Sequence, residues 1–458
     1  MFIQQEKGSA RSVALEVLVE VEENKAFSNL QLNAVLRRQP LERRDIGLAT
    51  ELVYGTLSRL NTLDWMVEQL SKKPISKLEP WVRCLLRLSI YQLAYLDRIP
   101  DRAVIHEAVE MAKNRGHQGI SGLVNGILRN YQRTKEEIKI PAQWPKFKKI
   151  AIEYSHPEWL VKRWLSLFGP EQTIEVCKTN NMAPFISLRS NRLKITKEEL
   201  MERLGKELPE AEFTYSHLAP DGITVGNGGG VASLEAFRQG LCTIQDESSM
   251  LVALALRVVP GMTVLDTCAA PGGKTTHVAE RMENKGSILA LDIHDHKLKL
   301  IDENAKRLGV GIIQTKLADA RMLPSDLSET LFDRVLVDAP CSGFGVIRRK
   351  PDLKWQKRFE DIAAITETQQ QILNQAARWV KPGGKLVYST CTIDPEENNK
   401  QLNHFIQMNP NFRLDPTLVE DLPEVLRAYV HKSGAYVQIL PHYFGSDGFF
   451  ISRVIRIH

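Results

Sequence analysis

Residues 264–280 read VLDTCAAPGGKTTHVAE, which is an apolar strand pattern, a glycine-containing loop and then a helical pattern. A phosphate-binding P-loop needs a glycine, four further residues and then Gly-Lys-Ser or Gly-Lys-Thr. Counting back from Gly273-Lys274-Thr275, the position of the first glycine is taken by Cys268, so the P-loop signature fails. What remains is a glycine turn that lets the backbone approach a ligand, beside a helix N-terminus that favours a carboxylate.

The sequence around this stretch, residues 246–458, alternates between strand and helix patterns. Strand candidates lie at 263–266, 287–292, 312–319, 334–340 and 385–390, and helical patterns lie at 274–282, 295–309 and 365–380. This alternation predicts an α/β, Rossmann-like domain in which helices cover both faces of a parallel sheet. In such a sheet the ligand lies outside the carboxyl ends of the strands.

Three successive strand candidates end in an acidic residue: Asp292, Asp319 and Asp338. An acidic residue about 20 positions after a glycine loop is suited to ribose hydroxyls, and Asp292 has that spacing. A single strand-end aspartate also serves as a helix cap, but three in succession favour a nucleoside-containing cofactor. Because the P-loop is excluded and a helix N-terminus is available for a carboxylate, S-adenosylmethionine fits better than ATP. NAD remains possible on these residues alone.

Two thiols follow strand candidates at the same predicted edge: Cys341 in DAPCSGFG and Cys391 in STCTIDPEEN. Residues 394–397, DPEE, predict a helix start whose positive end would favour a thiolate at Cys391. A thiolate that adds to carbon 6 of a pyrimidine makes carbon 5 nucleophilic, and a base must then remove the carbon-5 proton. Chemistry alone does not say which thiol attacks, and one cysteine could instead be a buried core residue.

The first part of the chain carries only helical patterns, which predict an all-α domain over residues 1–136. Periodicity alone leaves open a packing or oligomerisation module. Residues 137–158, with three prolines and several lysines, predict a linker. Residues 159–245 predict a small α+β domain, with a capping box at Thr196 and Glu199. Its GNGGG run at 226–230 does not match the dinucleotide-binding pattern GxGxxG, because the last glycine of that pattern would fall on Val231. A turn is expected at this run instead.

The totals are those of a globular protein of several domains. The chain has 458 residues, 43% hydrophobic and 25% charged, with a formal net charge of +5. The mild positive charge is weak support for a polyanionic partner. No signal-peptide pattern and no long apolar run occur, so a cytoplasmic protein is expected. In that compartment thiols stay reduced, and the six cysteines form no CxxC pair that would suggest a zinc site.

The chain resembles the RNA cytosine-C5 methyltransferase family, and over its whole length the branch of that family called RsmB, Sun or Fmu. The resemblance rests on CAAPGGKTTH (268–277), LVDAPCSGFGVIRRKPDLKW (336–355), STCTIDPEEN (389–398), QDESSM (245–250) and DGFF (447–450). The helical N-terminal region is similar to the NusB family, an RNA-binding fold. The resemblance is weakest across the linker and the middle domain.

The resemblance implies a role for each candidate residue. Cys391 would be the nucleophile, and Cys341 would assist release of the methylated product. The loop would line the methionine part of S-adenosylmethionine with Cys268, Ala269, Ala270, Pro271, Gly272, Gly273 and Lys274. Asp292 would hold the ribose, Asp319 would lie near the adenine, and Asp338 would sit between cofactor and cytosine with Lys274 close by.

The resemblance also implies a substrate, a cytosine of 16S ribosomal RNA that is still naked or early in assembly. The target base must leave its stack to reach the thiols. Arg348, Arg349, Lys350 and Lys354 would contact the RNA beside the active site. No metal or membrane partner is expected, and a monomer is favoured. One alternative is a non-catalytic RNA-binding assembly factor on this scaffold. Another is a methyltransferase that acts on protein or on DNA, but neither of those two reactions needs a Thr-Cys thiol in addition to the Pro-Cys thiol.

Overall fold

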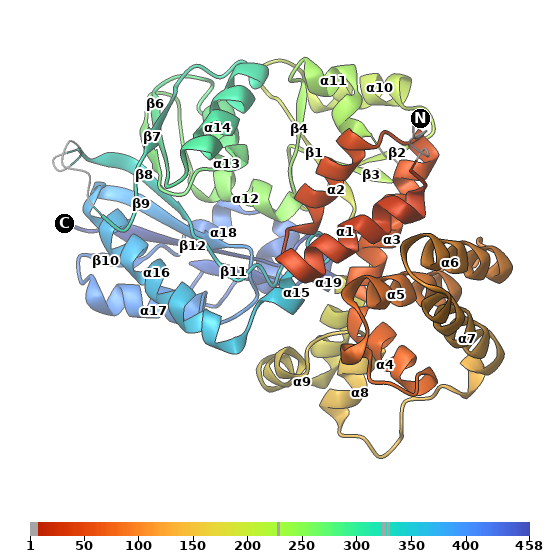
Figure 1. Cartoon of the computed structure of the whole chain (residues 1–458). Coiled ribbons are helices and arrows are strands. Elements are labelled where there is room, and N and C mark those ends of the chain that lie inside the picture. Colours follow the sequence, from red (N-terminus) through yellow and green to blue (C-terminus); the bar gives the residue numbers. More distant parts are fainter. Residues whose placement is uncertain (1–7, 227–229, 323–326, 328–329) are drawn as a thin grey trace. The chain divides into compact units, whose positions relative to one another are not determined.

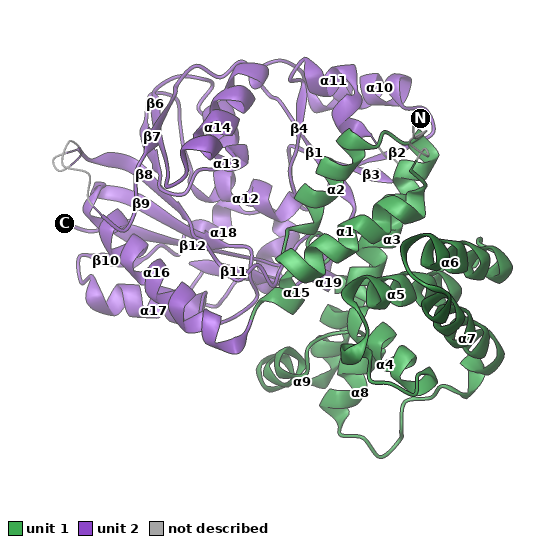
Figure 2. Ribbon diagram, viewed as in Figure 1, with its two compact units in different colours: residues 1–183, 347–357 green, residues 184–346, 358–458 purple. Residues whose placement is uncertain are grey.

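The computed structural model describes residues 8–226, 230–322, 327 and 330–458. The chain forms two compact units, shown in green and purple in Figure 2. Unit 1 comprises Met1–Ala183 together with Ile347–Lys357, and unit 2 comprises Pro184–Val346 and Arg358–His458. Unit 1 therefore contains a segment that interrupts the C-terminal domain in the sequence.

Unit 1 is all-α, as predicted for the N-terminal domain (Figure 1). Its helices are α1 (Ala10–Asn24), α2 (Ser28–Arg38), α3 (Arg43–Ser58), α4 (Leu60–Leu70), α5 (Pro80–Tyr95), α6 (Asp101–Arg115), α7 (Gln118–Thr134), α8 (Lys146–Glu153), α9 (Glu158–Asn180) and the short α15 (Leu353–Gln356). Helix α5 is buried over most of its circumference, as expected of a helix at the centre of a bundle. Pro80 occupies its first turn, where the missing N–H costs no hydrogen bond.

The predicted linker at 137–158 is wrong in part, because it contains α8, which packs against α4 and α9. Pro145 directly precedes the first residue of α8, where its missing N–H breaks no intrahelical hydrogen bond. Helix α9 also belongs to unit 1, although the sequence placed residues 159–180 in the α+β domain. Its regular dihedrals break at Gly169 (φ 74°), just before Pro170.

The middle region of the chain forms a four-stranded antiparallel sheet in unit 2. Its strands are β1 (Ile186–Ser190), β2 (Glu212–Tyr215), β3 (Gly222–Gly226) and β4 (Cys242–Ile244), in the order β2-β3-β1-β4. Helices α10 (Lys197–Glu207) and α11 (Glu235–Arg238) accompany it. The capping box of Thr196 and Glu199 is present at the start of α10. Residues 227–229 of the GNGGG run lie outside the described residues.

The larger sheet of unit 2 has the predicted parallel strands at its centre. These are β5 (Thr263–Asp266), β6 (Ser287–Asp292), β7 (Ile313–Leu317), β8 (Phe332–Asp338) and β9 (Val380–Thr390), in the spatial order β9-β8-β5-β6-β7. The sheet is mixed, because β10 (Phe412–Leu414), β11 (Tyr436–Ile439) and β12 (Phe449–Arg456) add antiparallel pairs. These three strands were not predicted from the sequence, because they are not part of the strand–helix alternation on which that prediction relied.

Helices cover both faces of this sheet, as predicted. Val264 and Leu336 pack in one core with α12 (Glu247–Ala255) and α13 (Gly273–Arg281), whereas the adjacent Leu265 and Val335 pack in a second core with α16 (Phe359–Arg378) and α17 (Asn399–Met408). Alternate side chains of a strand point to opposite faces, so the two cores lie on opposite sides of the sheet. Figure 1 shows α13 and α14 (Asp295–Leu308) on one side and α16 and α17 on the other.

No helix in the described part of the chain is long and apolar enough to cross a bilayer.

Candidate functional site

The predicted cofactor loop, residues 268–274, connects β5 to α13 and is held from within. Gly272 has a left-handed conformation (φ 97°), and a Cβ there would lie 3.1 Å from Cα of Ile301, so this position requires glycine. The Asp266 carboxylate accepts a hydrogen bond from Thr275 Oγ1 (2.7 Å). Burial raises the pKa of Asp266 to about 7; the Thr275 hydrogen bond opposes this shift and the charge of Asp338 adds to it.

The loop is also bound to the end of β6. The backbone N–H of Ala270 donates to Oδ2 of Asp292 (3.3 Å), and the N–H of His294 donates to Oδ1 (3.0 Å). Asp319 follows the neighbouring strand β7, and Arg321 donates to its Oδ2 from Nη2 (2.6 Å), which lowers the pKa of Asp319. The predicted strand-end aspartates therefore lie along one edge of the sheet, beside the loop.

Asp338, at the end of β8, joins the loop to the next strand. Lys274 Nζ donates to its Oδ2 (2.6 Å), and Ser389 Oγ donates to its Oδ1 (2.8 Å). Burial opposes the charge of Lys274, but Asp338 outweighs it and raises the pKa of the ammonium group above its ordinary value. The Lys274 ammonium also lies 5.2 Å from the ring centroid of Phe449, in the DGFF motif. The Lys274 ammonium group is therefore held by the Asp338 carboxylate.

The two predicted thiols meet in this part of the structure. Cys341 Sγ and Cys391 Sγ are 3.2 Å apart, and both residues are partly exposed. The hydrogen bond to Cys391 raises the pKa of Cys341 well above its ordinary value, and burial and the charge of Cys391 add to that shift. The close contact between the two sulfurs therefore favours the protonated form of Cys341.

Glu397 fixes the two cysteine loops to each other, and the sequence reasoning missed it. Its carboxylate accepts from the backbone N–H of Ser342 (2.7 Å), from Ser342 Oγ (2.5 Å) and from Thr392 Oγ1 (3.2 Å). Ser342 follows Cys341 and Thr392 follows Cys391, so one buried carboxylate positions both thiols. The STCTIDPEEN motif contained this residue, but the pattern gave no sign of its partners.

The expected helix start at 394–397 is wrong. Helix α17 begins at Asn399, and Asp394 Oδ1 instead accepts from the N–H of Glu396 (3.0 Å) in a turn. The helix end therefore gives no support to a thiolate at Cys391. The nearby positive charge is the Lys274 ammonium, which interacts electrostatically with Cys391.

The C-terminal strand closes the site from another side. The N–H of Gly345 donates to the Cys391 carbonyl (2.9 Å), and the N–H of Gly448 donates to the Gly345 carbonyl (2.8 Å). A Cβ on Gly345 would lie 1.9 Å from the Gly448 carbonyl oxygen, so only glycine permits this approach. The DGFF motif therefore packs directly against the loop that carries Cys341.

The RNA-contact prediction is wrong for Lys354. This side chain is fully buried, and its Nζ donates to the carbonyls of Ser58 (2.8 Å) and Ser155 (2.7 Å) within unit 1. Burial lowers the pKa of Lys354 well below its ordinary value. Arg348 is also buried (5% exposed), Arg349 is half-buried and Lys350 is exposed. A cation next to an active-site motif suggested phosphate binding, but the carbonyl partners of Lys354 are distant in sequence.

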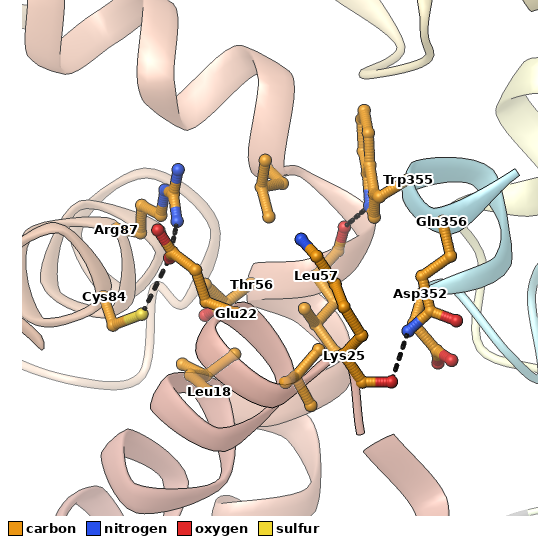
Figure 3. Close-up of a pocket in the computed structure, with 12 residues that line it drawn as sticks. Leu18, Glu22, Lys25, Thr56, Leu57, Cys84, Arg87, Asp352, Trp355 and Gln356 are labelled. Carbon is orange, nitrogen blue, oxygen red and sulfur yellow. Dashed lines mark hydrogen bonds and ion pairs between the residues drawn. The ribbon is translucent and has the colours of Figure 1, made fainter. Parts of the chain in front are cut away.

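The segment 347–357 lines a cavity of about 220 Å³ in unit 1, shown in Figure 3. Trp355 Nε1 donates to the Leu57 carbonyl (2.7 Å), and the Gln356 amide reaches the Lys25 carbonyl (3.4 Å). Glu22 and Arg87 form an ion pair on another wall. None of the predicted cofactor or thiol residues lines this cavity, and its walls instead explain how the segment is anchored.

Among the described residues, no group of three or more histidine, cysteine or acidic side chains is arranged to hold a metal ion.

Comparisons with known proteins agree with this architecture. The family model described as 16S rRNA methyltransferase RsmB/F matches residues 253–455, the NusB family model matches 8–133, and the RsmF/B-like ferredoxin-like domain model matches 156–232. The chain is 49% identical over 449 residues to "Probable ribosomal RNA small subunit methyltransferase B" of Bacillus subtilis, covering 97% of this chain and 98% of that protein. It is 35% identical to "Ribosomal RNA small subunit methyltransferase B" of Klebsiella pneumoniae, covering 98% and 99%.

Two solved structures are also similar. The crystal structure of PH0851 aligns with a TM-score of 0.79 at 27% identity, covering 98% of this chain and all of that one. A methyltransferase homolog protein from Pyrococcus horikoshii aligns with a TM-score of 0.57 at 28% identity, covering 68% of this chain and 99% of that one.

Proposed function

The chain belongs to the RsmB/F family of 16S rRNA methyltransferases, and from that premise we propose that it methylates carbon 5 of a cytosine in 16S rRNA. We propose S-adenosylmethionine as the methyl donor and a covalent cysteine–cytosine intermediate. The observation that carries the proposal is the pair of thiols 3.2 Å apart beside the Asp338–Lys274 ion pair. An rRNA methyltransferase that modifies an exocyclic nitrogen or a ribose hydroxyl has no use for such a pair.

The loop and strand ends fit S-adenosylmethionine. A Cβ on Gly273 would meet no atom within 4 Å, so open space lies in front of this glycine. The first N–H groups of α13 have no intrahelical acceptor and favour a carboxylate. The residues that would hold the cofactor are the loop at 268–274, Asp292 at the ribose and Asp319 near the adenine. When bound, the cofactor supplies an electrophilic methyl group on a sulfonium.

The two thiols would act in sequence. The Cys391 thiolate adds to carbon 6 of the cytosine, and the Lys274 ammonium stabilises the negative charge before the addition. Once the Cys391 sulfur is bonded to carbon, it no longer carries a charge or accepts the Cys341 proton. The main cause of the raised pKa of Cys341 then disappears. Cys341 would then release its own proton to solvent, and its thiolate would take the carbon-5 proton as the bond between Cys391 and carbon 6 breaks.

The direct test is methyl transfer from radiolabelled S-adenosylmethionine to 16S rRNA free of ribosomal proteins. We expect one labelled nucleotide per RNA, identified as 5-methylcytidine by nucleoside chromatography. Label in a different nucleoside would contradict the carbon-5 proposal. RNA binding without any transfer would favour the alternative of a non-catalytic assembly factor.

We further propose that unit 1 docks the RNA. Deleting residues 1–136 is a poor test, because Lys354 and Trp355 would lose the Ser58 and Leu57 carbonyls that they contact. A full-length variant is better. A groove between α6 and α7 is lined by Arg102, His106, Lys113 and Arg129.

We predict that the triple variant Arg102→Glu, Lys113→Glu, Arg129→Glu binds 16S rRNA about tenfold more weakly, with a shallower salt dependence. Its affinity for S-adenosylhomocysteine should not change. The matched control reverses the exposed Lys72, Lys73 and Lys77, which lie outside the groove. Equal losses in both triple variants, measured by filter binding, would mean that general charge and not this groove attracts the RNA.

A further inference from the structure

Arg189 lies in β1 of the middle sheet, a part of the chain to which the proposed reaction assigns no residue. Its side chain is fully buried and forms an ion pair with the equally buried Glu280 of α13 (Nη2 to Oε1, 2.7 Å). Strand β1 is central in its sheet and pairs with β3 and β4 on either side. Arg189 is therefore a rigidly mounted cation that reaches from the middle sheet to the helix that follows the cofactor loop.

The guanidinium group makes five hydrogen bonds, which uses its full set of N–H donors. Two go to Glu280, one to Thr276 Oγ1 (3.1 Å) and one to the side-chain oxygen of Gln245. The fifth goes to the backbone carbonyl of Gly273 (2.7 Å). Gln245 belongs to the QDESSM motif, which the proposed function otherwise leaves unexplained.

The bond to the Gly273 carbonyl bears on the cofactor loop directly. A trans peptide is planar, so its C=O and the following N–H point in opposite directions. Holding the Gly273 carbonyl toward the middle sheet therefore turns the N–H of Lys274 the other way. That N–H lies in the first turn of α13 and has no intrahelical acceptor, so it is available to a ligand.

The ion pair itself is a weak reason for this arrangement. A buried pair can be replaced by apolar side chains of similar volume with little loss of stability, whereas removing one partner is costly. An apolar pair would fill the space between β1 and α13, but the Gly273 carbonyl would then lose its charged donor and keep the hydroxyl of Thr276 (3.2 Å). What the guanidinium adds beyond packing is the orientation of the loop.

We infer that Arg189 is a positioning residue for the cofactor: it orients the Gly273–Lys274 peptide for the carboxylate of S-adenosylmethionine. The inference rests on the proposed function, since it takes the loop to be the cofactor site. The middle sheet thereby contributes to cofactor affinity without touching the cofactor.

The test separates orientation from charge balance with the double variant Arg189→Met, Glu280→Gln. The double change removes both charges, so the thermal midpoint should fall less than in Arg189→Met alone, which leaves Glu280 buried without its partner. The dissociation constant for S-adenosylhomocysteine, measured by calorimetry well below the midpoint, should rise about tenfold. The KM for RNA should not change.

Arg189→Lys provides a second variant in case the double variant does not fold. Lysine keeps the charge opposite Glu280, but its single ammonium lacks the fork that serves Glu280 and Gly273 together. The same rise in the dissociation constant is expected. The matched control is Asn191→Leu, two residues along β1, whose amide contacts the carbonyls of Gly240 and Leu308 and not the cofactor loop. It should lower the thermal midpoint and leave the dissociation constant unchanged.

Natural affinity for S-adenosylhomocysteine in both Arg189 variants would overturn the inference, because Arg189 would then only balance Glu280. A rise as large in Asn191→Leu would also overturn it, since any loosening of the middle sheet would then suffice. If the natural chain itself does not bind S-adenosylhomocysteine, the proposed function fails and the inference fails with it.

Discussion

Replacing Cys391 by serine is expected to reduce methyl transfer by about 10⁴-fold or more, since a residue that forms the covalent bond has no substitute. The serine oxygen fits the same space, but a hydroxyl ionises far less readily than a thiol and is a poor nucleophile without a strong base. The rate should be measured in a single turnover with labelled S-adenosylmethionine and saturating enzyme. Binding of S-adenosylhomocysteine should not change, because the loop and strand ends are intact.

The control for this change is Cys242→Ala, which removes a buried thiol of β4 in the middle sheet. That variant should lose some stability and keep its rate, because Cys242 is part of a hydrophobic core. A Cys391→Ser enzyme that still forms an RNA adduct, beside a Cys341→Ser enzyme that does not, would exchange the roles of the two thiols.

The central sheet and the edge that carries the site were predictable because their signals are local. An apolar strand pattern followed by a glycine turn identifies the loop at 268–274 from neighbouring residues alone, and the loop lies where β5 ends. Asp292 and Asp338 end β6 and β8, so their placement follows from the topology of any parallel sheet. The strand–helix alternation did not predict β10, β11 and β12, because an antiparallel strand can follow its neighbour without a connecting helix.

The residues that position the site were not predictable, because each acts through contacts far away in the sequence. Glu397 accepts a hydrogen bond from Ser342, and Arg189 donates one to the Gly273 carbonyl. Lys354 is buried and donates to backbone carbonyls of unit 1. A charged side chain in a motif is equally compatible with a surface contact and with a buried bridge. Local pattern favoured the surface for Lys354 and a helix start for Glu397, and the structure contradicts both.

Replacing Cys341 by alanine should have the opposite signature to loss of Cys391: the enzyme should react once and remain bonded to its RNA. The adduct forms through Cys391, but the carbon-5 proton then lacks the thiolate that removes it, and the cysteine–carbon bond cannot break. We expect a species of enzyme plus RNA that survives a denaturing gel, and methyl transfer that stops at about one equivalent per enzyme.

The adduct must depend on both thiols in a defined way. The double variant Cys341→Ala, Cys391→Ala should give no adduct, and the single variant should form it only when S-adenosylmethionine is present if methyl transfer precedes the block. Normal multiple turnover by Cys341→Ala would show that another group takes the proton, and Asp338, held between Lys274 and Ser389, would then be a candidate. That carboxylate already accepts two hydrogen bonds, one of them from an ammonium group. The direct contact of Cys341 with Cys391 favours this thiol as the group that takes the carbon-5 proton.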